Sequence, residues 1–281
     1  MTANTVITTS ITTRPIALLT DFGLTDPYVG QLRATLNRLA PGSALLDISH
    51  QVEPFGTAQA SFFLAASAPH FPPGTVFMCV VDPGVGSARR ILGARLGDQP
   101  DAQTFLAPDS GLLGLMLDTP GLPKAHIFDL SDAAARYASS ATFHGRDIFA
   151  PLAARLADNE PLEAMGPELV AASIVSRPWA APERVEGGVL AHVLHVDRFG
   201  NCVLSVRDGN VFPAPVTGLS QGPRERVRIR QVRAYADLAP GEVGLLIGSQ
   251  GFLEIAANMA SAAHQLTLRS GDPVRLLFNE A

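Results

Sequence analysis

Short apolar runs alternate with amphipathic stretches along the first two thirds of the chain. The runs have the length and composition of buried strands, and the stretches between them carry apolar residues at helical spacing. The predicted strands are 16–23, 44–49, 75–81, 104–108 and 126–130, and the predicted helices are 28–39, 57–68 and 147–158. Strands that alternate with helices predict a central, mostly parallel sheet flanked by helices, which is an α/β domain.

The pattern changes near residues 176–188, a segment rich in Pro, Ala and Gly. Beyond it, residues 188–197, 226–235 and 272–278 alternate or run apolar between turns, which predicts a smaller antiparallel β domain. One helix is predicted from 253 to about 264. We therefore expect four parts: a flexible tail 1–14, an α/β domain 15–178, a linker 179–187 and a C-terminal β domain 188–281.

Composition and charge narrow the possible partners. The chain has 281 residues, of which 47% are hydrophobic, so it can bury a sizeable core. A formal charge of −5 and the lack of a basic stretch argue against nucleic acid as a partner. No apolar run reaches the length of a membrane span, and the Thr-rich start lacks the features of a secretory signal. We expect a cytoplasmic protein with no membrane partner, in which Cys79 and Cys202 are buried thiols.

Acidic residues follow three of the predicted strands. Asp21, Asp82 and Asp109 each come just after an apolar run. Ligands of parallel α/β sheets bind outside the carboxyl ends of the strands, so the three carboxylates mark a candidate site. Each aspartate taken alone is equally typical of a turn or a helix cap.

A carboxylate, a guanidinium and an imidazole occur in two of these loops. Asp82 and Arg89 lie in VVDPGVGSARR, and His144 lies in ATFHGRDIFAP. Brought together, these groups can bind, orient and deprotonate a water molecule. The alternatives are a structural hydrogen bond for His144 and a local ion pair between Arg146 and Asp147.

A second set of polar residues lies in the C-terminal part. If the strand continues through HVDRFGNCVL, then Asp197, Phe199 and Asn201 share one face and suit a ligand with an amine and a flat ring. The alternative is a tight turn over the same residues. Ser249 lies in a Gly-rich turn that is predicted to open a helix, where free N–H groups would face a carboxylate.

Several familiar signatures are absent. The loop after residue 81 lacks the third glycine of the dinucleotide fingerprint and the Gly-Lys-Ser/Thr of a P-loop. A Gly-x-Ser-x-Gly elbow is also missing. His192 and His195 are three apart on a predicted strand, so they point to opposite faces and do not share a metal ion. We expect no metal and no cofactor.

Seven motifs in order resemble one known family, the S-adenosyl-L-methionine (SAM) hydroxide adenosyltransferases, which are SAM hydrolases related to fluorinase and chlorinase. The resemblance covers residues 15–281. Its motifs are TDFGLTDPYVG, DISHQVEPF, VVDPGVGSARR, APDSGLLG, TFHGRDIFAP, VDRFGN and GSQGFLEIAAN. It implies hydrolysis of SAM to adenosine and L-methionine by a homotrimer. The implied active sites lie between the N-terminal domain of one subunit and the C-terminal domain of the next.

The resemblance also implies roles for residues of the N-terminal part. Asp82, Arg89 and His144 match the catalytic triad of the hydrolases, in which His144 is the natural general base, although the sequence leaves the proton acceptor open. Asp21 matches the aspartate that holds the ribose hydroxyls. Phe55 takes the place of an aromatic residue that packs against the nucleoside.

In the C-terminal part the resemblance implies the remaining substrate contacts. Phe199 and Asn201 match residues that contact adenine. Asp197 matches the group that meets the methionine ammonium, and Ser249 the group that meets its carboxylate. Gln250 stands where fluorinase has an arginine.

Two departures separate the chain from the halogenases. Those enzymes carry a tyrosine at the position of Asp82 and a small hydroxyl residue or glycine near Val85. Val85 offers a halide no hydrogen bond, so the resemblance favours hydrolysis. A SAM-dependent halogenase that forms 5′-chloroadenosine and a SAM- or nucleoside-binding protein without turnover are the alternatives.

Overall fold

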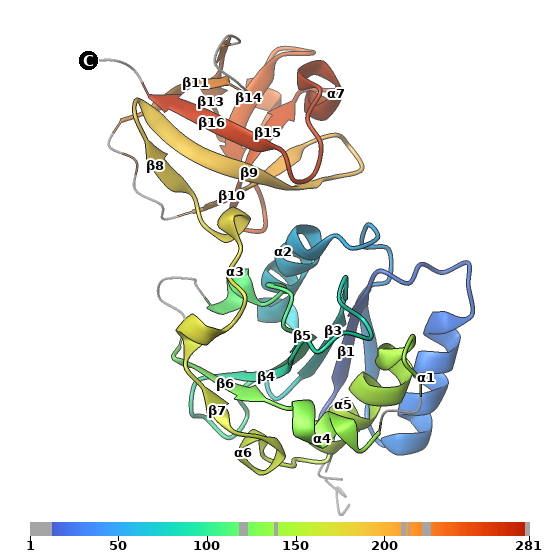
Figure 1. The fold of residues 1–281 in the computed structure, drawn as a ribbon. Coiled ribbons are helices and arrows are strands. Elements are labelled where there is room, and N and C mark those ends of the chain that lie inside the picture. The colour runs from blue at the N-terminus through green and yellow to red at the C-terminus, as the bar shows by residue number, and fades with distance from the viewer. Residues whose placement is uncertain are drawn as a thin grey trace, which may run out of the picture. The chain divides into compact units, whose positions relative to one another are not determined.

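The computed structural model describes residues 13–117, 123–137, 140–208, 212, 214–220 and 226–278. The chain forms two compact units, each with its own sheet (Figure 1). The N-terminal unit comprises Met1–Phe55, His70–Leu113 and Gly121–Val175, and the C-terminal unit comprises Gly56–Pro69, Gly114–Pro120 and Ser176–Ala281, within the described ranges. Two short segments from the first half of the sequence therefore belong to the C-terminal unit.

The N-terminal unit contains a seven-stranded sheet in the order β2-β1-β3-β5-β4-β6-β7. Its strands are β1 (Ile16–Thr20), β2 (Leu45–Ser49), β3 (Val76–Val80), β4 (Ile91–Leu96), β5 (Thr104–Pro108), β6 (Ala125–Asp129) and β7 (Glu168–Leu169). The strands β2, β1, β3 and β5 run parallel as predicted, while β4, β6 and β7 add antiparallel pairings. The sequence pattern missed β4, in which Gly93 and Arg95 interrupt the apolar run.

The helices of the N-terminal unit bury the apolar stripes that the sequence shows. They are α1 (Tyr28–Leu39), α4 (Ser131–Ala135), α5 (Ala150–Ala157) and α6 (Leu162–Met165), with a 3₁₀ turn at Ala171–Ser173. Helix α1 has the predicted bounds and buries Val29, Leu32 and Leu36. The predicted helix 147–158 begins instead with a π-helical turn, η2 (Gly145–Phe149), which continues into α5.

The start of the N-terminal unit is fixed at Arg14. Residues 1–12 of the predicted tail lie outside the described residues. The Arg14 amide donates to the carbonyl of Ala157 over 2.8 Å, and its guanidinium donates to the Ala102 carbonyl and the Thr104 hydroxyl. These bonds link the segment that precedes β1 both to the start of β5 and to the end of α5.

The C-terminal unit contains a nine-stranded sheet in the order β12-β11-β16-β9-β10-β15-β14-β13, with β8 paired to β9. The strands are β8 (Glu183–Val185), β9 (Gly188–Val196), β10 (Cys202–Arg207), β11 (Val216–Ser220), β12 (Val227–Arg228), β13 (Arg230–Gln231), β14 (Val243–Ile247), β15 (Phe252–Ala257) and β16 (Pro273–Phe278). Pairing is antiparallel except between β13 and β14, which run parallel. The sheet is therefore mixed and has more strands than that of the N-terminal unit, in contrast to the small antiparallel domain predicted.

Short helical elements accompany this sheet. They are α2 (Thr57–Ser67), the 3₁₀ turn Ala68–His70 that follows it, α3 (Gly114–Leu117), α7 (Ala262–Leu266) and the 3₁₀ turns at Pro178–Ala180 and Tyr235–Asp237. The segment 179–187, predicted as a linker, contains β8 and so contributes a strand to the sheet.

The helix predicted over 253–264 is wrong. Residues Phe252–Ala257 form β15, and only Ala262–Leu266 are helical. Strand β15 is paired on both edges, with β10 and β14, and all six of its residues are buried. A central strand buried on both faces shows no alternation of polar and apolar residues, so its alanines resembled a helix in the sequence.

No helix in the described part of the chain combines the length and the apolar character needed to cross a membrane.

A stacked aromatic pair packs across two neighbouring strands in the parallel half of the N-terminal sheet. Phe77 of β3 and Phe105 of β5 are register partners, their ring centroids lie 4.9 Å apart, and both are almost fully buried. Strand β3 ends at the loop that carries Asp82, so this packing also supports the candidate site.

Replacing Phe77 by alanine should leave a cavity beside the Phe105 ring, on the buried face of the sheet. We expect Phe77→Ala to lower the free energy of unfolding by about 3–5 kcal/mol. Urea unfolding followed by circular dichroism measures this, with Val170→Ala as the control because Val170 is 74% exposed. Equal unfolding midpoints for the two variants would contradict the assigned packing.

Candidate active site

Parallel strands bring two of the predicted aspartates to one edge of the N-terminal sheet. Asp21 directly follows β1 and Asp82 lies two residues beyond the neighbouring strand β3. Asp21 Oδ2 accepts a hydrogen bond of 3.0 Å from the amide of Phe55. Burial raises the pKa of Asp21, the Phe55 bond opposes this rise, and the charge of Asp82 adds to it. The Asp21 carboxylate is thus held beside a second carboxylate.

Arg89 joins Asp82 to His144. Its Nε donates to Asp82 Oδ1 over 2.5 Å, and its Nη2 donates to Asp82 Oδ2. The same Nη2 lies 3.0 Å from His144 Nδ1. The side chains of Asp82 and Arg89 are only 6% and 10% exposed, so the ion pair is largely shielded from solvent. The three side chains predicted from the sequence to act on a water molecule therefore form one network.

The Arg89 contact fixes the protonation of His144. A guanidinium has only donors, so His144 Nδ1 must be the acceptor, and the neutral ring carries its proton on Nε2. Burial lowers the pKa of His144 and the charge of Arg89 lowers it further, while Asp82 and Asp147 oppose the change. His144 is therefore a neutral ring at physiological pH, with an Nε2–H that makes no hydrogen bond within the described part of the chain.

Aromatic packing and a π-helical turn set the position of His144. The preceding residue, Phe143, packs edge-on against Phe22 and Tyr28, with centroid distances of 5.6 and 5.3 Å. His144 itself is the N-cap of η2. Single π-helical turns occur often at functional sites.

The next two residues of this segment pair with each other. Arg146 Nε donates to Asp147 Oδ1 over 2.6 Å, so the local ion pair considered for them is confirmed.

Asp109, the third aspartate predicted at this edge, bonds to Arg90 and Val175 instead of joining the network of Asp82. Its Oδ2 accepts from Arg90 Nε and Nη2 at 2.9 and 2.7 Å, and its Oδ1 accepts from the amide of Val175 at 2.8 Å. The carboxylate thus holds the segment after β7 against the start of β4.

In the C-terminal unit the predicted contacts lie on a turn rather than along a strand. Strand β9 ends at Val196, and Asp197 Oδ1 accepts from the amides of Phe199 and Asn201 at 2.9 and 2.8 Å. Asp197 Oδ2 accepts from Asn201 Nδ2 at 2.9 Å. Gly200 has φ 85°, in the left-handed region that glycine tolerates. The shared strand face was therefore wrong and the tight turn is correct.

Ser249 also has a different setting from the one predicted. The turn 248–251 connects β14 to β15 as a hairpin, with the Gly248 amide bonded to the Phe252 carbonyl over 2.8 Å. It opens a strand, so the helix N-terminus expected to face a carboxylate is absent from this described segment.

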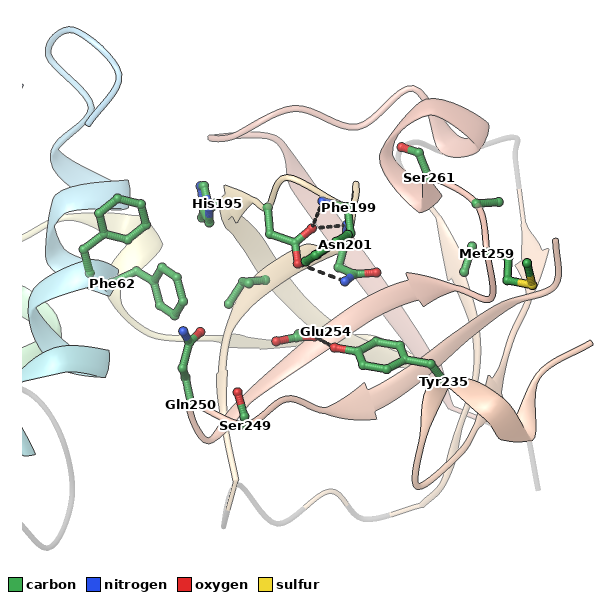
Figure 2. A pocket seen from close by; sticks show the side chains of 15 residues that line it. Phe62, His195, Phe199, Asn201, Tyr235, Ser249, Gln250, Glu254, Met259 and Ser261 are labelled. Carbon is green, nitrogen blue, oxygen red and sulfur yellow. Dashed lines mark hydrogen bonds between the residues drawn. The ribbon is translucent and has the colours of Figure 1, made fainter. Parts of the chain in front are cut away.

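A cavity of about 780 Å³ lies in the C-terminal unit (Figure 2). This volume is within the usual range for small-molecule sites. The predicted contacts Asp197, Phe199, Asn201, Ser249 and Gln250 all line it. It is also lined by Phe62, Phe63, His195, Val203, Tyr235, Glu254, Ala257, Met259, Ala260 and Ser261.

Two polar pairs at this cavity were missed in the sequence. Glu254 is 6% exposed, and its Oε2 accepts from the Tyr235 hydroxyl over 2.9 Å. Gln59 Nε2 lies 2.8 Å from His195 Nδ1. The sequence held one signal for Glu254, since it is the only charged residue in the run FLEIAA.

The rings predicted to contact the nucleoside are exposed. Phe55 is 68% exposed and has φ 65°, while Phe199 is 77% exposed. The structure thus gathers Asp21, Phe55 and the Asp82–Arg89–His144 network in the N-terminal unit. It gathers the other contacts around the cavity of the C-terminal unit. Among the residues described, no three His, Cys, Asp or Glu side chains are grouped as metal ligands.

Two family descriptions match the chain. The SAM hydroxide adenosyltransferase N-terminal domain matches residues 16–166, and the C-terminal domain of the same family matches residues 191–275.

Named relatives cover nearly the whole length. An (R)-S-adenosyl-L-methionine hydrolase of Thermus thermophilus is 39% identical over 94% of this chain and 100% of its own. A protein of the same name from Salinispora tropica is 36% identical over 93% of this chain and 97% of its own. A fluorinase of Actinopolyspora mzabensis is 28% identical over 94% of this chain and 97% of its own. An uncharacterized conserved protein from Thermotoga maritima has a similar crystal structure, with a TM-score of 0.78 and 34% identity over 93% of this chain and 99% of its own.

The charge of Arg89 should control the titration of His144. In the wild type we expect an NMR-detected pKa for His144 below the ordinary histidine value. In Arg89→Ala the nearby cation is removed and the carboxylate of Asp82 remains, so the pKa should rise. An unchanged or lower pKa in the variant would show that Arg89 does not contact the ring.

Proposed function

Because the chain belongs to the SAM hydroxide adenosyltransferase family, we propose that it hydrolyses S-adenosyl-L-methionine to adenosine and L-methionine. The observation that carries this proposal is the network in which Arg89 joins Asp82 to His144 at the edge of the N-terminal sheet. The network holds donors and an acceptor for one water molecule, next to an aspartate suited to ribose hydroxyls.

The reaction is a substitution at the ribose C5′. A water oxygen forms a bond to C5′ while the C5′–S bond breaks and its electron pair passes to sulfur. The sulfonium becomes the neutral thioether of methionine, and the water loses one proton. The protein must therefore hold the water in line with the C5′–S bond and receive a proton. Alignment of this kind contributes roughly 7–11 kcal/mol in favourable cases.

Within the network we assign separate tasks to the three side chains. His144 Nδ1 is occupied by Arg89 and Nε2 already carries a proton, so the imidazole positions the water by donating to its oxygen. The Asp82 carboxylate is then the proton acceptor that remains. The guanidinium of Arg89 favours hydroxide character at the water through its charge. Because the sulfonium already leaves as a neutral thioether and the steps involve no redox change, the reaction needs neither activation of the leaving group nor an electron carrier, and we propose that no metal or cofactor takes part.

The other residues are proposed to bind the substrate. Asp21 holds the ribose hydroxyls, and its orientation is set by the Phe55 amide, whose exposed ring packs against the nucleoside. Asn201 and Phe199 contact adenine. These assignments are supported by the exposure of both phenylalanine rings.

At the amino-acid end, Asp197 is proposed to meet the ammonium and Ser249 the carboxylate. Both residues line the same cavity, and Gln250 beside Ser249 supplies a further amide group.

We further propose a cytoplasmic homotrimer in which each site combines the N-terminal unit of one subunit with the C-terminal unit of the next. Large apolar side chains are exposed around both sets of contacts, including Val85 and Phe55 in one and Phe199 and Met259 in the other. Apolar surface of this kind is typical of an interaction face. Both cysteines are free and buried, which suits a reducing compartment.

The product identifies the reaction. Purified protein incubated with SAM should release adenosine and methionine in equal amounts, with and without chloride. Formation of 5′-chloroadenosine alone would establish the halogenase alternative. Tight SAM binding without methionine release would establish the binding-protein alternative.

In the same assay Asp82→Asn should lower kcat by roughly 10²–10⁴-fold with little change in KM, because a proton acceptor is lost. The matched control is Asp132→Asn, an exposed aspartate of the same unit. Equal losses in kcat and in affinity for SAM would assign Asp82 a structural role.

Mixed trimers test the shared site. Assayed at SAM concentrations well below KM, Asp82→Asn and Asp197→Asn subunits are each expected to be nearly inactive alone. Co-assembled in equal amounts, they should regain about a quarter of wild-type activity, because a quarter of the sites then combine two intact units. Light scattering reports the mass of the assembly. Trimers without recovered activity would place each site within one subunit, and a monomeric mass would refute the assembly.

A further inference from the structure

The cavity of the C-terminal unit contains a buried carboxyl group that the proposed reaction leaves unexplained. Glu254 lies on the central strand β15, is only 6% exposed, and lines the cavity together with Asp197 and Ser249. Figure 2 shows its side chain between Asn201 and Ser249. A charged residue on a fully buried strand is uncommon and calls for a partner.

One oxygen of Glu254 has a partner and the other does not. Oε2 accepts from the Tyr235 hydroxyl over 2.9 Å, whereas no donor among the described residues reaches Oε1. A Cβ at Gly248 would lie 1.8 Å from Oε1, so the carboxyl group rests against the backbone of the turn that carries Ser249. Oε1 is therefore placed beside the proposed contact for the amino-acid end of the substrate.

The charges around the cavity are unbalanced. Asp197 and Glu254 both face it, and among the described residues that line it His195 is the only one with a basic side chain. Burial lowers the pKa of His195, with Asp197 opposing the change, so this ring is neutral. Burial raises the pKa of Glu254 and the charge of Asp197 raises it further, against the effect of the Tyr235 bond. A cation in the cavity would complement both carboxylates.

Asp197 cannot satisfy an ammonium group by itself. It already accepts three N–H groups from its own turn, from Phe199 and Asn201. A primary ammonium has three donors and needs further acceptors. Glu254 Oε1 is an acceptor in the same cavity that the protein leaves without a donor.

We propose that Glu254 is a second anionic contact for the ammonium of the substrate and makes the site selective for sulfonium compounds that carry an amino-acid group. This inference rests on the proposed function and deepens it. Tyr235 positions the Glu254 carboxylate through the hydrogen bond to Oε2, and Gly248 leaves the room that Oε1 occupies.

The test compares two substrates in Glu254→Gln, a variant that keeps the shape of the side chain and an acceptor for Tyr235. One substrate is SAM, and the other is 5′-deoxy-5′-dimethylsulfonioadenosine, which has the same reacting sulfonium and no ammonium. The ratio of kcat/KM for SAM to kcat/KM for the truncated substrate should fall roughly 10–100-fold, mostly through KM for SAM. Glu183→Gln, an exposed glutamate on β8, is the control and should keep the wild-type ratio.

An unchanged ratio, whether from equal losses on both substrates or from none, would overturn the assignment. Calorimetry with L-methionine and with 4-methylsulfanylbutanoate, which lacks the ammonium, makes the same comparison without turnover. Wild-type protein that turns over neither sulfonium would refute the proposed function, while the calorimetric comparison would still decide the role of Glu254. If Glu254→Gln does not fold, Glu254→Asp withdraws the carboxylate by one methylene, and the same loss of discrimination is expected.

Discussion

The fork of hydrogen bonds made by Arg89 is the interaction on which the candidate site depends. A guanidinium can only donate, so it binds the carboxylate that follows β3 and, at the same time, fixes the tautomer of an imidazole that comes 55 residues later in the sequence. Without Arg89, the buried Asp82 carboxylate would lose the guanidinium that pairs with it, and the ring of His144 could rotate or take a proton. One side chain thus sets charge, orientation and protonation state together.

The sequence predicted that these site residues meet at one edge of the sheet, because their placement depends on strong local patterns. Strands β1 and β3 are continuous apolar runs, and parallel neighbours end at the same sheet edge, so Asp21 and Asp82 had to lie close to each other. Helix α1 showed a clear apolar stripe and was predicted with its observed bounds. The residue types indicated that Arg89 and His144 could act together. Which ring nitrogen of His144 accepts the hydrogen bond from Arg89 is decided by the folded structure.

What the sequence did not reveal arises from contacts between distant segments. Strand β15 is buried by pairing on both edges, so local alternation is lost and its alanines resemble a helix. The turn after β9 is set by bonds from Asp197 to its own backbone, which compete with continued strand geometry. The role proposed for Glu254 could not be predicted, because it depends on contacts with Tyr235, Gly248 and the cavity that only the folded chain forms.

The central claim is that a water molecule held by Asp82, Arg89 and His144 attacks C5′. In the competing route, the Asp82 carboxylate attacks C5′ itself. A single turnover of SAM in H₂¹⁸O, with enzyme in excess, distinguishes these routes by mass spectrometry of the adenosine. Direct attack by water predicts that the 5′-oxygen of adenosine carries the full isotopic enrichment of the solvent. Unlabelled adenosine in the first turnover would show that the oxygen came from the Asp82 carboxylate through an ester, and would contradict the account.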